Sequence, residues 1–127
     1  MKPTVLVIED NEQNRYLVSY LLERHGYSVV CASDGQRGLE MVKSLTPVLI
    51  LLDIQLPTMD GYAVARALRA DPSLRDIPIV AVTSYAMPGD QEKAMASGCT
   101  GYIEKPIDPE TFVSSMERHL KPRGAGA

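Results

Sequence analysis

Polar side chains stand directly after four of the short apolar runs in this 127-residue chain. Short apolar runs that end abruptly are typical of strands buried on both faces of a parallel sheet. Ligands of such sheets bind outside the carboxyl ends of the strands. We therefore expect the residues that follow these runs to meet in one site: Glu9, Asp10, Asp53, Thr83, Ser84 and Lys105.

Three of these residues, Glu9, Asp10 and Asp53, are carboxylates. Carboxylates gathered at one sheet edge repel one another, and one of them becomes protonated unless a cation compensates. The candidate ligands are oxygen atoms, which select a hard ion, and one or two carboxylates with waters and a phosphate oxygen suit Mg²⁺ better than Ca²⁺. We expect a Mg²⁺ site that Mn²⁺ can also occupy.

With a cation in place, one carboxylate can attack phosphorus as a nucleophile and form an aspartyl phosphate. Asp53 is our candidate for this role. Lys105 supplies a point charge for the phosphoryl oxygens, and Thr83 supplies a hydroxyl hydrogen bond. The backbone carbonyl of Gln55, two residues beyond the nucleophile, completes the expected protein ligands of the metal.

Each of these residues also has a simpler explanation. An acid after a strand often caps the following helix, as Asn11 could also do, and an isolated lysine is usually solvated. Other phosphate chemistries leave different marks, because the chain has neither a GxxxxGK[ST] loop nor a GxGxxG turn. A dehalogenase-like phosphatase would carry an Asp-x-Asp motif, whereas Gln55 stands at the second position here.

Five apolar runs predict strands, and segments of helical period follow each of them. Asp34 and Asp108 are expected N-caps, and His25 and Ser97, each before a glycine, are expected helix ends. Five repeats of strand and helix predict a doubly wound α/β domain, (βα)5, with a five-stranded parallel sheet. We expect one domain over 1–121, a flexible tail over 122–127, and strands over 5–8, 27–31, 48–52, 79–82 and 101–104.

The composition agrees with a soluble globular domain, since 45% of the residues are hydrophobic and 23% are charged. A net charge of -3 provides no basic surface for nucleic acid, and no apolar stretch approaches the length that spans a bilayer. Cys31 and Cys99 stand alone, as reduced thiols in a cytosolic protein do. We expect a cytoplasmic protein that neither binds nucleic acid nor inserts into a membrane.

As an ordered set, the motifs resemble the receiver domains of two-component response regulators along nearly the whole chain. The set comprises Glu9-Asp10-Asn11, Asp53-Ile-Gln-Leu-Pro57 with Gly61 behind it, Val82-Thr83-Ser84, and Lys105-Pro106. The resemblance implies a flavodoxin-like fold and a cis peptide before Pro106. The segment from 83 to 90 is similar to receivers of hybrid histidine kinases and of stand-alone cell-division regulators.

The resemblance also assigns roles. It implies that Asp53 is the phosphoacceptor, that Asp10 binds Mg²⁺ directly and Glu9 largely through water, and that Lys105 pairs with the phosphate. A switch would couple Thr83 to an inward turn of Tyr102, although an aromatic in an edge strand is often mere packing. In this family Gln55 and Tyr85 would flank the water that removes the phosphate.

The implied phosphoryl donor is a histidine kinase or a histidine phosphotransfer protein. The output is then a protein contact over residues 86–97, the Tyr102 strand and the final helix. The competing interpretation is a receiver-like scaffold that binds a kinase without being phosphorylated. The chain could be a stand-alone regulator or a receiver cut from a hybrid kinase, and its first residue and short tail favour the former.

Overall fold

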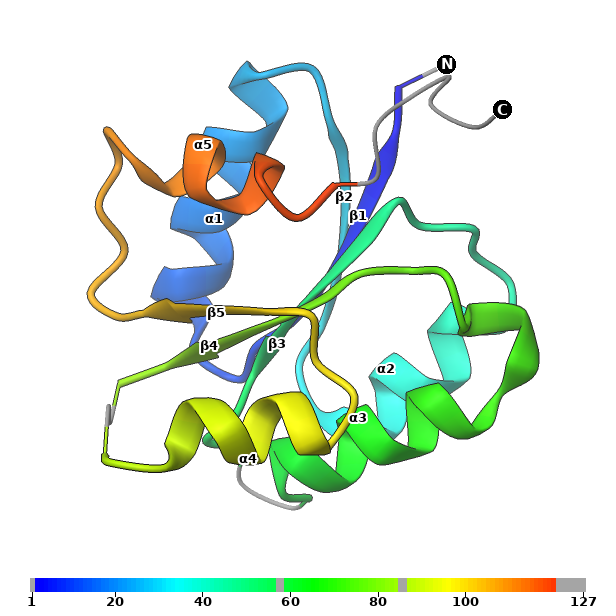
Figure 1. Cartoon of the computed structure of the whole chain (residues 1–127). Helices are drawn as coiled ribbons and strands as arrows, with labels where there is room; N and C mark the ends of the chain where they lie inside the picture. Colours follow the sequence, from blue (N-terminus) through cyan, green and yellow to red (C-terminus); the bar gives the residue numbers. More distant parts are fainter. Residues whose placement is uncertain (1, 57–58, 85–86, 121–127) are drawn as a thin grey trace.

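One parallel sheet forms the centre of the molecule (Figure 1). The computed structural model describes residues 2–56, 59–84 and 87–120. Within these ranges the sheet has five strands in the order β2-β1-β3-β4-β5. The expected (βα)5 sheet is confirmed, and its strands are β1 Thr4–Ile8, β2 Ser28–Ala32, β3 Leu49–Asp53, β4 Ile79–Thr83 and β5 Gly101–Glu104.

Helices cover both faces of the sheet, with α1 and α5 on one side and α2, α3 and α4 on the other (Figure 1). Alternate strand residues pack into two separate clusters, so that Val7 contacts the α1 and α5 side while Ile8 contacts the other. This is the doubly wound arrangement. The helices are α1 Glu12–Arg24, α2 Gly35–Val42, α3 Gly61–Ala70, α4 Asp90–Ala96 and α5 Phe112–Glu117, with a 3-10 turn at Pro72–Leu74.

The central strands are apolar because both of their faces are covered. Every residue of β3 and β4 is buried, whereas the edge strands β2 and β5 are mostly half-buried. The continuous apolar runs of the sequence therefore correspond to the middle of the sheet, and the two weaker candidate runs correspond to its edges. The predicted bounds of β2 and β3 were one residue early.

The helix caps agree with the sequence except at the last helix. Asn11 accepts a hydrogen bond from the Asn14 amide, and Asp34 caps α2 in the same way. The prediction that Asp108 caps the final helix was wrong, because α5 begins at Phe112 with Thr111 as its N-cap. Asp108 instead accepts from the Glu110 amide at 2.9 Å, which closes a turn before the helix.

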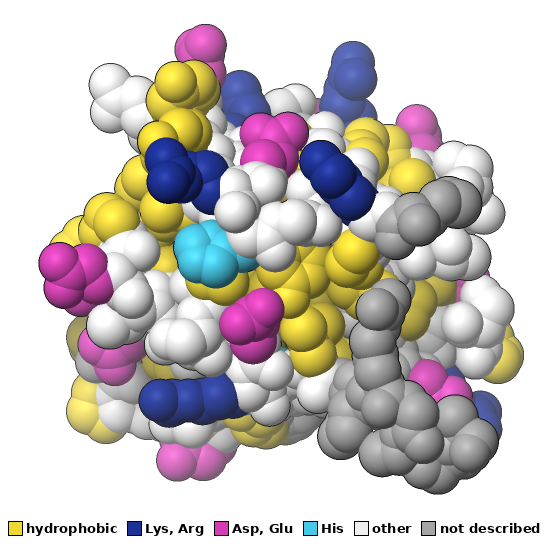
Figure 2. All heavy atoms as spheres, turned by 90° about the horizontal axis from the view of Figure 1, so that it is seen from above, with side chains coloured by type: hydrophobic (Ala, Val, Ile, Leu, Met, Phe, Trp, Pro, Cys, Tyr) yellow, Lys and Arg dark blue, Asp and Glu magenta, His cyan; other side chains and the backbone are white. Residues whose placement is uncertain are grey.

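Charged side chains of both signs are interspersed over one end of the molecule, with hydrophobic side chains exposed between them (Figure 2). The described residues contain no helix that is both long and apolar enough to cross a bilayer. Cys31 and Cys99 are free thiols. The predicted tail, 122–127, lies outside the described residues.

Candidate functional site

Neighbouring strands bring the predicted site residues together at the carboxyl edge of the sheet. β1 pairs with β3 so that Ile8 lies opposite Leu52, which places the next residues, Glu9 and Asp53, side by side. β4 lies on the other side of β3 and ends at Thr83. Lys105 follows directly after β5 and donates its backbone amide to the Thr83 carbonyl.

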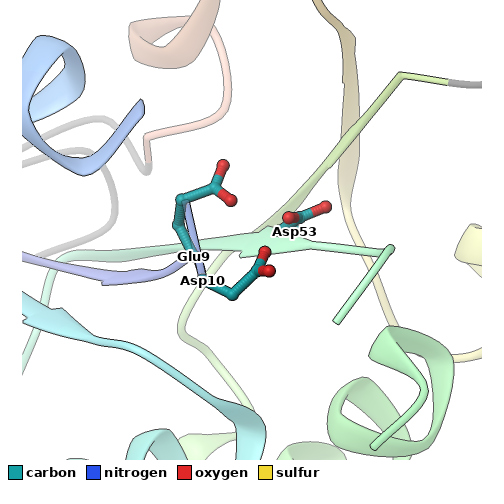
Figure 3. A group of neighbouring side chains, drawn as sticks. All are labelled: Glu9, Asp10 and Asp53. Carbon is teal, nitrogen blue, oxygen red and sulfur yellow. The ribbon is translucent and has the colours of Figure 1, made fainter. Parts of the chain in front are cut away.

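The three acidic side chains form one cluster (Figure 3). One carboxylate oxygen from each of Glu9, Asp10 and Asp53 lies within 4.8 Å of the other two. Glu9 is 4% exposed and Asp53 is 3% exposed, whereas Asp10 is exposed to solvent. A cation could therefore reach the buried carboxylates from the side of Asp10.

Lys105 is the basic partner of this cluster. Its Nζ lies 2.8 Å from Glu9 Oε1 and 3.4 Å from Asp53 Oδ2. Burial acts to lower the pKa of Lys105, but the hydrogen bond to Glu9 and the charge of Asp53 outweigh it, and the pKa is raised. The ammonium is therefore charged. The peptide bond between Lys105 and Pro106 is cis, as the resemblance implied.

Burial disfavours the charged form of Asp53. Its pKa is raised from 3.8 to about 6, mainly by burial and then by the neighbouring Glu9 carboxyl. The Gln55 backbone amide, which donates to Asp53 Oδ1 at 2.9 Å, and the charge of Lys105 act in the opposite direction. One ammonium therefore does not offset the crowding of the carboxylates.

The donor set fits a hard divalent cation. Three carboxylates face a single lysine, which leaves an excess of negative charge, and the exposed Asp10 opens the cluster to solvent. Oxygen-only ligands of this kind suit Mg²⁺ or Mn²⁺. Asp10 and Asp53 could bind such an ion directly, and Glu9 Oε1 contacts Lys105. The metal contacts predicted for the Gln55 carbonyl and, through water, for Glu9 stay predictions.

A glycine lies behind the Asp53 backbone. The Gly61 amide donates to the Ile54 carbonyl at 3.2 Å, and a Cβ at Gly61 would lie 2.8 Å from the Asp53 carbonyl oxygen. Any side chain at this position would therefore push α3 away from the acidic cluster. This close approach accounts for the glycine in the motif that follows Asp53.

A hydrogen-bond bridge joins the β3 and β4 sides of the site. Gln55 Nε2 donates to Thr83 Oγ1 at 2.5 Å, and the Ser84 amide donates to Gln55 Oε1 at 3.0 Å. Tyr102 is half-buried, and burial raises its pKa while a hydrogen bond with Thr83 partly counteracts the rise. Thr83 and Tyr102, the two residues of the expected switch, are therefore neighbours.

The structure brings together every predicted site residue that it describes: Glu9, Asp10, Asp53, Gln55, Thr83, Ser84, Tyr102 and Lys105. Tyr85 and Pro57 lie outside the described residues. The side-chain hydrogen bonds of Gln55 to Thr83 and Ser84 were not predicted, since the roles expected for Gln55 were a backbone carbonyl on the metal and a place beside the attacking water. No sequence signal reveals this contact, because the partners are 28 and 29 residues away.

The fold is that of known signalling domains. The family model for the response regulator receiver domain matches residues 5–117. The chain is 40% identical over 120 residues to the polar-differentiation response regulator DivK of Brucella anthropi, covering 94% of this chain and 98% of that protein. The chain therefore belongs to the response regulator receiver domain family of two-component signalling.

Solved structures agree with this assignment. The receiver domain of the sensor histidine kinase PA1611 from Pseudomonas aeruginosa, which has a magnesium ion in its active-site cleft, matches with a TM-score of 0.85 and 30% identity, covering 94% of this chain and 98% of that one. A co-crystal structure of the Saccharomyces cerevisiae phosphotransfer protein Ypd1 with the Ssk1 receiver domain also contains a match. Its TM-score is 0.85 at 28% identity, covering 94% and 89% of the two chains.

Proposed function

We propose that Asp53 accepts a phosphoryl group from a phosphohistidine in a Mg²⁺-dependent reaction. The observation that carries this proposal is the convergence of three carboxylates and one lysine where the strands end. Burial and the neighbouring Glu9 raise the Asp53 pKa to about 6, which is unfavourable for a charged carboxylate. A residue that served only in packing or in helix capping would not need such neighbours. Asp53 is our candidate nucleophile because it ends β3, the central strand of the sheet, and its carboxylate contacts Lys105.

In the proposed transfer, an Asp53 carboxylate oxygen forms a bond to phosphorus. The bond from phosphorus to the donor imidazole nitrogen breaks, and its electron pair stays on that nitrogen. Lys105 moves its charge from Glu9 and Asp53 to a phosphoryl oxygen, and the Thr83 hydroxyl donates to another. Asp10, Asp53 and the Gln55 carbonyl would hold Mg²⁺, which would supply positive charge to the phosphoryl oxygens.

The domain acts on no external substrate in this account and catalyses only its own phosphorylation and dephosphorylation. Dephosphorylation is the attack of water on the aspartyl phosphate, which returns the Asp53 carboxylate and inorganic phosphate. We place the protein in the cytoplasm, where kinase and phosphotransfer domains meet their receivers. A histidine kinase or a phosphotransfer protein is the donor, by analogy with the Ypd1–Ssk1 pair.

The signal leaves through a protein contact on the face formed by α4, β5 and α5. Thr83 moves toward the phosphoryl group in this proposal, and Tyr102, whose hydroxyl is hydrogen-bonded to Thr83, turns inward after it. Because Tyr102 lies on β5, this movement changes the surface that a downstream partner would contact.

The test is to incubate the protein with Mg²⁺ and either acetyl phosphate or a phosphorylated histidine kinase. We expect an adduct that survives acid and is lost in base, and we expect none from Asp53→Asn. Asp71→Asn is the matched control, because asparagine also serves as a cap and Asp71 caps the 3-10 turn that precedes β4 at the amino end of the sheet. A phosphorylation-independent scaffold would give no adduct with any donor, yet Asp53→Asn would still bind the kinase normally.

A further inference from the structure

The side chain of Gln55 links the proposed phosphoacceptor strand to the residue that would contact the phosphoryl group. Its backbone amide donates to Asp53 Oδ1, while its side-chain amide contacts two successive residues at the end of β4. Gln55 is thus hydrogen-bonded both to Asp53 and, through its side chain, to Thr83 and Ser84.

The direction of these hydrogen bonds follows from chemistry. A backbone N–H can only donate, so the Ser84 amide requires the carbonyl oxygen of the Gln55 side chain to face it. The Gln55 NH₂ group must then face Thr83, and an NH₂ group can only donate. The Thr83 oxygen is therefore an acceptor in this contact, and its hydroxyl hydrogen points away from Gln55.

We propose that Gln55 is a positioning residue that holds the Thr83 hydroxyl as a hydrogen-bond donor toward the phosphoryl group. An oxygen that already accepts one hydrogen bond becomes a better donor through its own hydrogen. Thr83 is also hydrogen-bonded to Tyr102, so in this proposal the hydroxyl hydrogen turns to the phosphoryl group while Gln55 holds the Thr83 oxygen in place. The second contact, to the Ser84 amide, keeps the Gln55 amide from rotating. This inference rests on the proposed function.

The first experiment measures the two contacts without any phosphoryl donor. Hydrogen exchange of the Ser84 amide is compared in the wild type, Gln55→Met and Gln55→Glu. We expect the exchange to be roughly 3- to 10-fold faster in Gln55→Met, which has no acceptor, and unchanged in Gln55→Glu, which keeps one. Gln36→Met is the control, because Gln36 is an exposed glutamine on α2 whose side-chain amide donates to Glu40 on the same helix.

The second experiment measures the rate of adduct formation from acetyl phosphate at saturating Mg²⁺ for Gln55→Met, Thr83→Val and the double variant. Gln55→Met should form the adduct about 3- to 10-fold more slowly than the wild type, a loss equivalent to one ordinary hydrogen bond. In the Thr83→Val background the same substitution should have less than about a twofold effect, because the hydroxyl that it positions is gone.

Two results would overturn the inference. One is an unchanged Ser84 exchange rate in Gln55→Met, which would mean that the bridge does not form in solution. The other is a Gln55→Met loss of the same size in both backgrounds, which would mean that Gln55 acts independently of Thr83. If the wild type itself forms no adduct, the proposed function fails and this inference fails with it, whereas an adduct with additive losses rejects the inference alone.

Discussion

The two ends of the sheet differ in what they bury. At the carboxyl ends, Glu9, Asp53 and Thr83 are three of the four buried polar residues among those described, and the fourth, Ser97, donates to the Lys93 carbonyl on α4. At the amino ends, a mostly apolar hollow of about 350 Å³ is lined by Pro3, Tyr27, Pro47, Val48, Asp76, Ile77, Pro78 and Leu120. This hollow is therefore remote from the acidic cluster.

The difference shows how one fold separates stability from function. At the amino end, Pro3 and Pro78 directly precede β1 and β4, and Pro47 lies two residues before β3. Proline has no backbone N–H, so these positions need fewer hydrogen-bond partners. At the carboxyl end, by contrast, Asp53 is buried although burial raises its pKa and disfavours its charged form. If this contrast is correct, substitutions at the carboxyl end change metal binding and phosphorylation, and substitutions at the amino end change stability alone.

The largest expected effect comes from removing the lysine of the acidic cluster. Lys105→Met leaves Glu9 and Asp53 buried without a cation, so the metal-free protein should lose on the order of 3 kcal/mol in its free energy of unfolding. Millimolar Mg²⁺ should restore much of this loss. Urea titrations with and without Mg²⁺ measure both effects, and Lys43→Met on an exposed position is the control. An equal loss in the two variants would contradict the account.

The second effect has the opposite sign. The folded-state pKa of Asp53 is raised from 3.8 to about 6, so the folded protein favours the protonated carboxyl. Relative to high pH, this preference stabilises the fold fully below about pH 4, and the stabilisation is lost as the pH rises through about 6. In EDTA at pH 8, Asp53→Asn should therefore be more stable than the wild type by on the order of 2 kcal/mol. The gain should shrink toward pH 4. Denaturant titrations of both proteins at pH 4 and pH 8 measure this difference. A stability gain in Asp53→Asn that does not depend on pH would show that the raised pKa of Asp53 is not its cause.

Metal binding gives the third effect. When Mg²⁺ is present at about ten times its dissociation constant, the wild type should gain roughly 1.4 kcal/mol in stability. Mn²⁺ should act similarly, and Asp10→Asn should reduce the gain, because Asp10 is the exposed carboxylate of the cluster. Thermal unfolding with added MgCl₂ or the same ionic strength of NaCl separates site binding from screening. Equal shifts from both salts would exclude a metal site.

The smallest effect is expected at the amino end. Tyr27→Phe removes the hydrogen bond from the Tyr27 hydroxyl to Glu117 Oε2, which is 2.6 Å long, and should cost about 1 kcal/mol. The yield and rate of Asp53 phosphorylation should stay at the wild-type value, because this contact lies at the other end of the sheet. A change in phosphorylation at full Mg²⁺ saturation would show that the two ends are coupled.

The sequence predicted most of the fold because the period of its apolar residues reports burial on each element. The runs now seen as β3 and β4 could only be strands covered on both faces, and the polar residues at their ends then had to meet. The error at Asp108 arose because a proline after an aspartate is as compatible with a turn as with the first turn of a helix.

The parts of the site that could not be predicted depend on side-chain geometry. Lys105 was expected at the phosphate, and the structure adds that it contacts Glu9 more closely than Asp53, at 2.8 Å against 3.4 Å. The side chain of Gln55 carries no signal of its partners, because two residues 28 and 29 positions away become neighbours only through the pairing of β3 with β4. Spacing along the chain shows which strands end in polar groups, and not which atoms meet.

The most direct test of the central claim is to locate the phosphoryl group. The protein is incubated with Mg²⁺ and acetyl phosphate, the adduct is reduced with borohydride, and the modified residue is identified by peptide mass spectrometry. We expect modification at Asp53 that disappears when EDTA replaces Mg²⁺. Modification at another residue, or an equal yield in Asp53→Asn, would contradict it.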